Sequence, residues 1–216
     1  MSNPIFTIGH SDHILDAFLA LLDRHTVKGV ADIRSAPDSR RAPQFNRENI
    51  NAFLKENGIE YVFLGRQLGA RRSERSCYVN GRAEYEKIAE LPIFKAGIRR
   101  ICRDSEERRI ALMCAEKDPL FCHRSVLVSP ALVREGKEVV HIHADGRLEI
   151  HAELEERMIR ETGVEPDLFA GGNDPAALVA RAYSVLGSRL ASTETEVTQQ
   201  AGQPSVGWGQ TPGRWG

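Results

Sequence analysis

The segment IFTIGHSDHILDAFLALLDRHTVKGVADIRS, residues 5–35, carries the pattern that decides the fold. A short apolar run, Ile5 to Gly9, reads as a strand, and a second run, Gly29 to Ser35, reads as another. Between them lies an amphipathic helix with Ser11 or Asp12 as its predicted cap. Its apolar face comprises Ile14, Phe18, Leu21 and Leu22. Strand, helix and strand in this order are typical of a βαβ unit in a parallel sheet.

The same alternation continues along most of the chain. Further strands are predicted at 59–65, 109–116 and 138–146, and further helices at 47–57, 84–104, 123–135, 150–162 and 175–186. Pro130 predicts a bend or a restart at Ser129 within the helix 123–135. The pattern predicts an α/β fold, a single three-layer domain with a mostly parallel sheet over residues 1–165, followed by a helical extension over 166–186.

Composition changes near Gly187. Residues 187–216 contain six Gly, four Thr and four Gln, with almost no periodic apolar positions. Such a segment cannot bury enough apolar surface to offset the entropy lost on ordering. The sequence therefore predicts a disordered tail over 187–216, in which Trp208 and Trp215 either contact a partner or are incidental.

The overall composition is that of a water-soluble globular protein. Of the 216 residues, 41% are hydrophobic and 27% charged, which excludes a fibrous chain and a chain disordered throughout. No stretch is long and apolar enough to span a membrane, so no membrane partner is expected. The start, MSNPIFTIGH, lacks the basic and apolar regions of a secretory signal, which predicts a cytoplasmic protein with reduced cysteines.

Reactive residues follow the predicted strands where each strand ends. In open parallel sheets, ligands bind outside the carboxyl ends of the strands, where the loops into the helices meet. The candidates at these positions are His10 and Ser11, Asp32 and Arg34, Cys114 and Glu116, and the triplet Cys122, His123 and Arg124. The sequence therefore predicts one cleft at this edge of the sheet.

Cys122, His123 and Arg124 carry the most chemistry, because they stand together at the start of a predicted helix. Unpaired N–H groups at a helix N-terminus can bind an anion or lower the pKa of a cysteine. Arg124 adds a guanidinium that can bind phosphate or carboxylate. The alternative is structural, with Cys122 as a small buried apolar residue and Arg124 at the surface or in an ion pair.

Cys114 and Glu116 have structural and functional interpretations of similar weight. Cys114 ends an apolar strand, and cysteine is among the commonest core residues. Glu116 leaves that strand and must point into the cleft or find a partner, for which Arg124 is the candidate. We retain Cys114, Glu116, Cys122 and His123 as candidate catalytic residues.

Two arginine-rich segments accompany this cleft. Residues 34–47 contain four Arg and one Asp, residues 66–75 contain four Arg and one Glu, and residues 149–174 contain eight acids and two bases. The net charge of −1 therefore conceals a dipolar molecule. It excludes a global attraction to nucleic acid, but the arginines could line a positive cleft, or simply face solvent. The remaining candidate ligand-binding residues in this region are Ser39, Arg40 and Asn46.

A metal site receives weaker support. His141 and His143 project from one face of the last predicted strand and could join Cys114, Cys122 and His123 in a site of nitrogen and sulfur ligands. The cysteine spacing is unlike that of a zinc ribbon, and no second CxxC occurs. We therefore predict no metal ligands, and the cofactor stays unknown.

Several motifs resemble one family. They are TIGHS (7–11), VADIRSAPDSRRAPQFN (30–46), the Leu68-Gly69 loop, ALMCAEKDPLFCHR (111–124) and VVHIHADG (139–146). Over about residues 5–160 the chain resembles the family named domain of unknown function 488. The resemblance implies an α/β fold and no particular reaction. The motif positions that it carries over are Gly9, His10, Ser11, Asp32, Arg34, Pro37, Ser39, Phe45, Asn46, Cys114, Glu116, Cys122, His123 and Arg124.

Three functions compete at this stage. The first is an enzyme, a transferase or hydrolase, that binds an anionic substrate bearing a phosphate or resembling a nucleotide. The second is a sulfurtransferase or thiol-redox enzyme, because the Asp-x-Arg strand end and the cysteine loop are similar to the rhodanese layout. The third is a non-catalytic module for nucleic acid, disfavoured by the scarcity of aromatic residues for base stacking. The sequence does not predict an oligomeric state.

Overall fold

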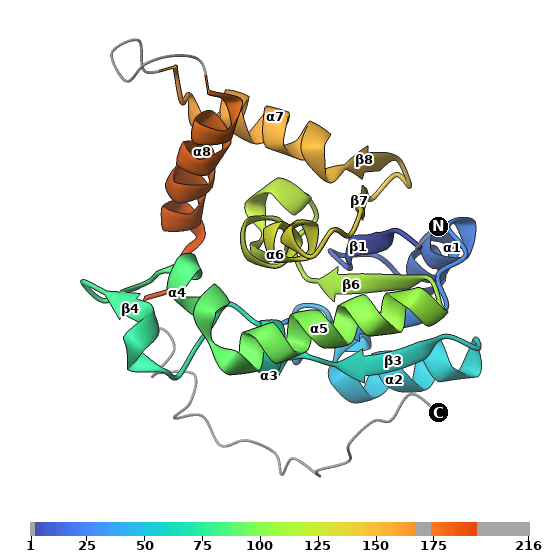
Figure 1. Cartoon of the computed structure of the whole chain (residues 1–216). Coiled ribbons are helices and arrows are strands. Elements are labelled where there is room, and N and C mark those ends of the chain that lie inside the picture. Colours follow the sequence, from blue (N-terminus) through green and yellow to red (C-terminus); the bar gives the residue numbers. More distant parts are fainter. Residues whose placement is uncertain (1–2, 167–173, 194–216) are drawn as a thin grey trace.

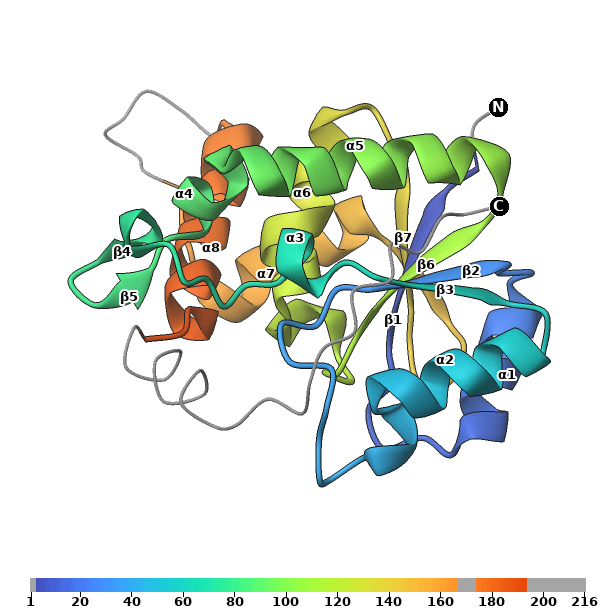
Figure 2. The ribbon, with the colours of Figure 1, turned by 90° about the horizontal axis from the view of Figure 1, so that it is seen from below.

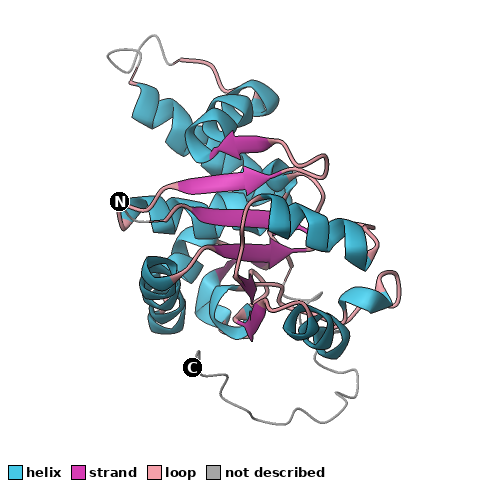
Figure 3. Cartoon of the chain, turned by 90° about the vertical axis from the view of Figure 1, so that its right-hand side faces the viewer, coloured by secondary structure: helices cyan, strands magenta, loops and turns pink. Residues whose placement is uncertain are grey.

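The computed structural model describes residues 3–166 and 174–193, and within them a six-stranded sheet runs in the order β3-β2-β6-β1-β7-β8. The strands are β1 (Ile5–Gly9), β2 (Gly29–Asp32), β3 (Glu60–Phe63), β6 (Ile110–Cys114), β7 (Val139–Ile142) and β8 (Leu148–Ile150). Every pairing is parallel except that of β7 with β8. Figure 3 shows the strands stacked across the molecule with helices around them. The predicted α/β fold with a mostly parallel sheet is confirmed.

Helices cover both faces of this sheet, as Figures 1 and 2 show. They are α1 (Leu15–Arg24), α2 (Arg47–Glu56), α3 (Gly65–Leu68), α4 (Tyr85–Glu90), α5 (Pro92–Glu107), α6 (Ser129–Arg134), α7 (His151–Thr162) and α8 (Pro175–Leu190). In the ranges that the structure describes, none of these helices is long and apolar enough to cross a membrane.

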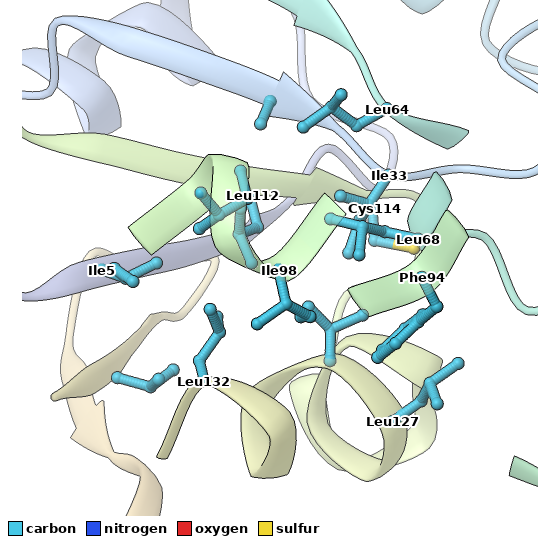
Figure 4. Packing of buried hydrophobic residues seen from close by; sticks show 14 of the residues in the cluster. Ile5, Ile33, Leu64, Leu68, Phe94, Ile98, Leu112, Cys114, Leu127 and Leu132 are labelled. Carbon is cyan, nitrogen blue, oxygen red and sulfur yellow. The ribbon is translucent and has the colours of Figure 1, made fainter. Parts of the chain in front are cut away.

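The two faces of the sheet bury separate apolar clusters, as expected for a parallel sheet covered on both sides. On one face, Phe18 of α1 and Ile50 of α2 pack against apolar side chains of the sheet. On the other face, Ile98 of α5 and Leu132 of α6 pack against the sheet, and Cys114 belongs to the same cluster (Figure 4). The resulting layers are helix, sheet and helix.

A third apolar cluster joins α7 and α8 to the loop after β6. Its buried members are Leu120, Val126, Leu154, Met158, Ala182 and Leu186. The chain after α8 returns to a small hairpin formed by β4 (Tyr78–Val79) and β5 (Arg82–Ala83). There the Ala83 amide donates to the Ser192 carbonyl at 3.0 Å. The end of the described chain is thereby fixed beside the loops that follow the sheet.

The chain after Leu186 differs from its prediction. Residues 187–190 continue α8, because Ala182, Leu186 and Leu190 are spaced by four and share the helix face that packs into the third cluster. Gly187 lies inside this helix, where glycine costs only about 1 kcal/mol relative to alanine. The predicted disordered tail therefore begins too early, and its residues 194–216, including Trp208 and Trp215, lie outside the described residues.

The start of the first helix and three short strands also depart from the predictions. The first helix begins at Leu15, with Ile14 as its cap in place of Ser11 or Asp12, and Ile14 is 68% exposed. The strand β8 and the hairpin of β4 and β5 escaped prediction, because each is at most three residues long and lacks a buried run. The predicted restart at Ser129 is confirmed.

The helix around Pro130 explains that restart. Residues Arg124–Val128 form a π-helical turn, and α6 begins at Ser129. Proline has no backbone N–H, so the regular helical hydrogen bond from residue 130 cannot form. The Ser129 amide and hydroxyl both donate to the Arg124 carbonyl, the hydroxyl at 2.7 Å, which holds the π-helical turn against the start of α6. Such turns inside helices are frequently found at functional sites.

Candidate active site

The loops that leave the carboxyl ends of the strands enclose a cavity of about 440 Å³. Its lining residues are Arg34, Ser35, Ala36, Ala70, Arg71, Tyr85, Cys114, Ala115, Glu116, Phe121, Cys122, His123, Arg189, Leu190, Ala191 and Ser192. Five predicted site residues are therefore together, namely Arg34, Cys114, Glu116, Cys122 and His123. This is the edge at which open parallel sheets bind ligands.

Gly9 permits the loop after β6 to reach this position. The His10 and Ser11 amides donate to the Cys114 and Ala115 carbonyls at 2.8 and 2.9 Å, extending the pairing of β1 with β6. A Cβ atom on Gly9 would lie 1.8 Å from the Glu116 carbonyl oxygen. Only glycine allows the backbones of residues 9 and 116 to come this close.

Four side chains with reactive heteroatoms converge beyond this crossing. One donor atom each from Cys114, Glu116, Cys122 and His123 lies within 4.8 Å of the others. His123 Nδ1 is 3.5 Å from Cys114 Sγ and 3.9 Å from Cys122 Sγ. Cys122 Sγ donates to Glu116 Oε2 at 3.0 Å. We call these four residues the thiol cluster.

The orientation of His123 is fixed from outside the thiol cluster. Its Nε2 lies 3.2 Å from the Ile33 carbonyl oxygen. A carbonyl can only accept, so Nε2 carries a proton and Nδ1 faces the two sulfur atoms. Nδ1 can therefore carry a second proton beside a thiolate or offer its lone pair to an electrophile.

The two cysteines have opposite acidities. Burial raises the pKa of Cys114, but hydrogen bonding to Cys122 and the charge of His123 outweigh burial and lower it to about 6. Burial and the neighbouring Cys114 raise the pKa of Cys122 well above its ordinary value. The sequence suggested that the helix N-terminus could lower the pKa of Cys122, whereas burial and the contact with Cys114 act in the opposite direction. Cys122 donates to Glu116 and Cys114 is the sulfur nearer to His123 Nδ1, so Cys114 is the thiol of the pair that is better placed to ionise.

Glu116 carries a negative charge beside the two cysteines. Burial raises its pKa, but interactions with the neighbouring thiols, including the hydrogen bond donated by Cys122, and the charge of His123 lower it to about 2. The anticipated ion pair with Arg124 is missing from the part of the chain that the structure describes, where Arg124 Nη2 donates to the Lys117 carbonyl at 3.2 Å. Glu116 is therefore an ionised carboxylate that serves the thiol cluster.

Arg124 is fully buried beside the cavity and does not line it. Its Nε and Nη1 atoms have no hydrogen-bond partner among the described residues. Gly9 lies against the guanidinium, because a Cβ there would be 2.8 Å from Nη1. This buried cation lowers the pKa of nearby Cys122, although burial and Cys114 raise it more. Arg124 therefore places a positive charge behind the thiol cluster.

Asp32 and Arg34 lie in a buried ion pair next to the cavity. Arg34 Nε and Nη2 donate to the two carboxylate oxygens of Asp32 at 2.9 and 2.6 Å. Tyr61 also donates to Asp32, at 2.8 Å, and Arg34 Nη1 lies 3.1 Å from His10 Nε2. His10 stacks on Phe45, and its pKa is lowered to about 4 by burial and by Arg34. His10 is therefore a neutral acceptor that holds Arg34 in place.

The other predicted ligand-binding residues lie outside the cavity lining. Asn46 Oδ1 accepts from the Ser39 amide at 2.7 Å, and Ser39 Oγ accepts from the Arg41 amide at 3.1 Å, so these side chains shape their own loop. Arg40 is exposed, and Ser11 donates to its neighbour Asp12. Their predicted contact with a ligand stays a prediction.

The two histidines of β7 and its loop do not join the thiol cluster. His141 Nδ1 lies 2.7 Å from the Thr7 hydroxyl, and its Nε2 lies 3.0 Å from His151. His143 instead pairs with Glu149 at 2.8 Å. The side chains that converge with Cys114, Cys122 and His123 therefore include Glu116 and neither of these histidines.

Sequence reasoning missed several side chains of the cavity, among them Tyr85, Phe121 and Arg189. Tyr85 begins α4, and its hydroxyl donates to the Leu190 carbonyl at 3.2 Å. Phe121 and Arg189 are exposed on the lining. Arg189 lies in the segment interpreted as a tail, and the spacing of Ala182, Leu186 and Leu190 was the signal that could have found it.

The fold and the thiol cluster define an α/β protein with a cysteine-histidine site at the carboxyl edge of its sheet. The chain belongs to the family described as Domain of unknown function DUF488, whose family model matches residues 14–130. This match spans β2 and β6 and includes the whole thiol cluster. No curated protein and no solved structure matched the chain.

Proposed function

We propose that the protein is a cysteine-dependent enzyme acting on a small anionic substrate that bears a phosphate or resembles a nucleotide. The observation that carries this proposal is the convergence of the thiol cluster on a cavity with arginines in its lining. A nucleophile, an imidazole within reach and an anion-binding group are the elements of covalent catalysis.

The proposal assigns Cys114 as the nucleophile. Cys114 ends a buried strand and is 2% exposed, so its sulfur has a fixed position on the cavity wall. His123 Nδ1 is 3.5 Å away and can take the thiol proton or return it to a leaving group. Glu116 accepts the Cys122 S–H at 3.0 Å and so fixes the second sulfur near Cys114.

Arginines support the choice of an anionic substrate. Arg71 and Arg189 line the cavity with exposed side chains, one from the loop after α3 and one from the last turn of α8. Guanidinium groups bind phosphate with two parallel hydrogen bonds. Arg34 also lines the cavity, but Asp32 occupies two of its nitrogen atoms. Because their side chains are exposed at the lining, Arg71 and Arg189 are the proposed anion-binding residues.

A panel of nucleotides, sugar phosphates and inorganic pyrophosphate tests the proposal through binding and turnover. We expect at least one compound to bind, and Arg189→Gln to weaken binding by about tenfold, which corresponds to about 1.4 kcal/mol. Turnover should fall by about a hundredfold or more in Cys114→Ser. Cys102→Ser, a half-buried cysteine on α5, is the matched control. Binding of no phosphate compound at millimolar concentration would overturn the proposal.

Sulfur transfer is a second candidate, favoured by two thiols around one imidazole. In this reaction the Cys114 thiolate would attack the outer sulfur of thiosulfate, the S–S bond would break, and sulfite would leave. The resulting persulfide would pass its terminal sulfur to a nucleophilic acceptor and regenerate the thiolate. Intact mass after incubation with thiosulfate decides between the candidates, because only sulfur transfer adds one sulfur atom to Cys114.

A further inference from the structure

We infer that the thiol cluster is a zinc site, with Cys114, Cys122 and His123 as ligands and Glu116 at the fourth position. One donor atom from each residue lies within 4.8 Å of the other three. Two sulfurs, one imidazole nitrogen and one carboxylate oxygen are all donor types that zinc accepts in proteins. The site is proposed for the metal ion itself, so it does not depend on the proposed reaction.

The separations of the donor atoms fit a tetrahedral ion. Zinc bonds of about 2.3 Å to sulfur and about 2.0–2.2 Å to nitrogen or oxygen place tetrahedral ligands about 3.3–3.8 Å apart. The structure has 3.0 Å between Cys122 Sγ and Glu116 Oε2, 3.5 Å between Cys114 Sγ and His123 Nδ1, and 3.9 Å between Cys122 Sγ and His123 Nδ1. These three separations lie within a few tenths of an ångström of the tetrahedral values, and the other three are at most 4.8 Å, so the ligands would have to contract around the ion.

His123 is oriented as a metal ligand. Its Nε2–H donates to the Ile33 carbonyl at 3.2 Å, which directs the Nδ1 lone pair toward both sulfurs. Metal-binding histidines usually donate their second ring N–H to a carbonyl or a carboxylate in this way. The Arg124 amide donates to Cys122 Sγ at 3.4 Å and would support that sulfur as a thiolate. His123 and Cys122 thus each have a hydrogen-bond partner outside the thiol cluster.

The types of ligand atom and the charge around the site favour zinc. Thiolates favour zinc over magnesium and calcium, which require oxygen ligands. Two thiolates and a carboxylate around one divalent ion leave a net charge of −1 at the site. The buried guanidinium of Arg124, with Nε and Nη1 unpartnered among the residues described, lies behind the thiol cluster and offsets this charge. A metal-loaded site is therefore electrostatically supported.

Glu116 is the ligand most open to exchange. It is the exposed member of the thiol cluster, whereas Cys114 and Cys122 are buried. Three protein ligands with an exchangeable fourth position are typical of catalytic zinc, and four fixed ligands are typical of structural zinc. Zinc would coordinate the Cys114 sulfur and block its attack on a substrate. The proposed reaction of Cys114 as a nucleophile therefore requires the metal-free protein. A chelator should then increase that activity.

Metal titration of the full chain tests the inference. Protein stripped with a chelator is titrated with Zn²⁺ alone by calorimetry and with Co²⁺ alone by absorption. We expect one ion per chain and a sulfur-to-cobalt charge-transfer band in the near ultraviolet. Cys114→Ser, Cys122→Ser and His123→Ala should each weaken Zn²⁺ binding by about a hundredfold, and Glu116→Gln by about tenfold. Cys77→Ser and Cys102→Ser should leave it unchanged.

Alkylation of the unaltered protein covers the case in which a variant fails to fold. Zn²⁺ should protect Cys114 and Cys122 from alkylation and leave Cys102 equally reactive, with mass spectrometry of peptides as the readout. Stoichiometric binding with protection of both cysteines supports the site. Absence of the charge-transfer band, or Zn²⁺ binding unaltered in the folded Cys114→Ser variant, would overturn it. Neither result depends on finding a substrate, so failure here is distinct from failure of the proposed function.

Discussion

Asp32 and Arg34 form an ion pair that is almost sealed from solvent, at 0% and 5% exposure. Such a pair holds the Asp32 and Arg34 side chains in place next to the cavity, because each charge requires the other to offset its loss of hydration. Tyr61 and His10 add one hydrogen bond each to this network. At the scale of single residues, the Asp-x-Arg motif therefore has a structural use independent of any ligand.

This use predicts a large effect of Asp32→Asn on stability. The substitution leaves the buried Arg34 guanidinium without a counter-charge, so the free energy of unfolding should fall by about 3–5 kcal/mol. Urea unfolding measures the change. Tyr61→Phe, which removes a single hydrogen bond to Asp32, is the matched control and should cost about 1 kcal/mol. Equal losses in both variants would contradict the ion-pair interpretation.

The close crossing of β1 and the loop after β6 is the feature that matters at the scale of elements. We expect Gly9→Ala to lower the free energy of unfolding by about 1–3 kcal/mol, because the added methyl collides with the Glu116 backbone. It should also shift Glu116 and weaken Zn²⁺ binding, as measured by calorimetry. Retention of full stability and Zn²⁺ affinity would show that this crossing does not position the site.

Gly187→Ala tests whether residue 187 lies within the helix α8. Its added Cβ would lie 3.6 Å from the Tyr85 ring, an ordinary contact. Alanine is favoured over glycine in a helix, so thermal unfolding should show a stabilisation of about 0.5–1 kcal/mol. No stabilisation would be expected if residue 187 belonged to an unstructured tail, and that result would restore the boundary predicted from composition.

At the scale of the whole molecule, charges connect the last helices to the sheet. Burial raises the pKa of Glu149, but hydrogen bonds from Arg157 and His143 outweigh burial and hold the pKa below its ordinary value of 4.5. Arg157 also donates to both carboxylate oxygens of Asp118 at 2.9 Å. A depressed carboxyl pKa stabilises the fold above the unfolded pKa, and this contribution disappears as pH falls through the folded pKa.

This network predicts a pH-dependent difference between the unaltered protein and Glu149→Gln. At pH 7 the variant should be less stable, by about 1–2 kcal/mol in urea unfolding. The difference should shrink below about pH 4.5, where the unfolded carboxyl begins to bind a proton, and should vanish at lower pH. A difference that stays constant between pH 7 and pH 3 would show that lost packing, rather than charge, causes the destabilisation.

The sequence predicted long elements well and short ones poorly. Runs such as Ile5 to Gly9 are buried on both faces, so their apolar character alone marks a central strand. The strand Leu148–Ile150 has two exposed positions and forms only because the preceding turn folds it back on β7. Cys114, Glu116, Cys122 and His123 were predictable because strand ends share one edge. Their relative acidities depend on side-chain contacts that spacing does not reveal.

The reactivity of Cys114 toward an anionic reagent tests the central claim most directly, because that claim joins a reactive thiol to a cationic cavity. Peptide mapping of the metal-free protein gives the alkylation rates with iodoacetate and with neutral iodoacetamide. We predict that the rate with iodoacetate divided by the rate with iodoacetamide is higher at Cys114 than at Cys102. Arg189→Gln should lower this ratio at Cys114 several-fold. An equal ratio at both cysteines, unaffected by Arg189→Gln, would contradict an anion-binding cysteine site.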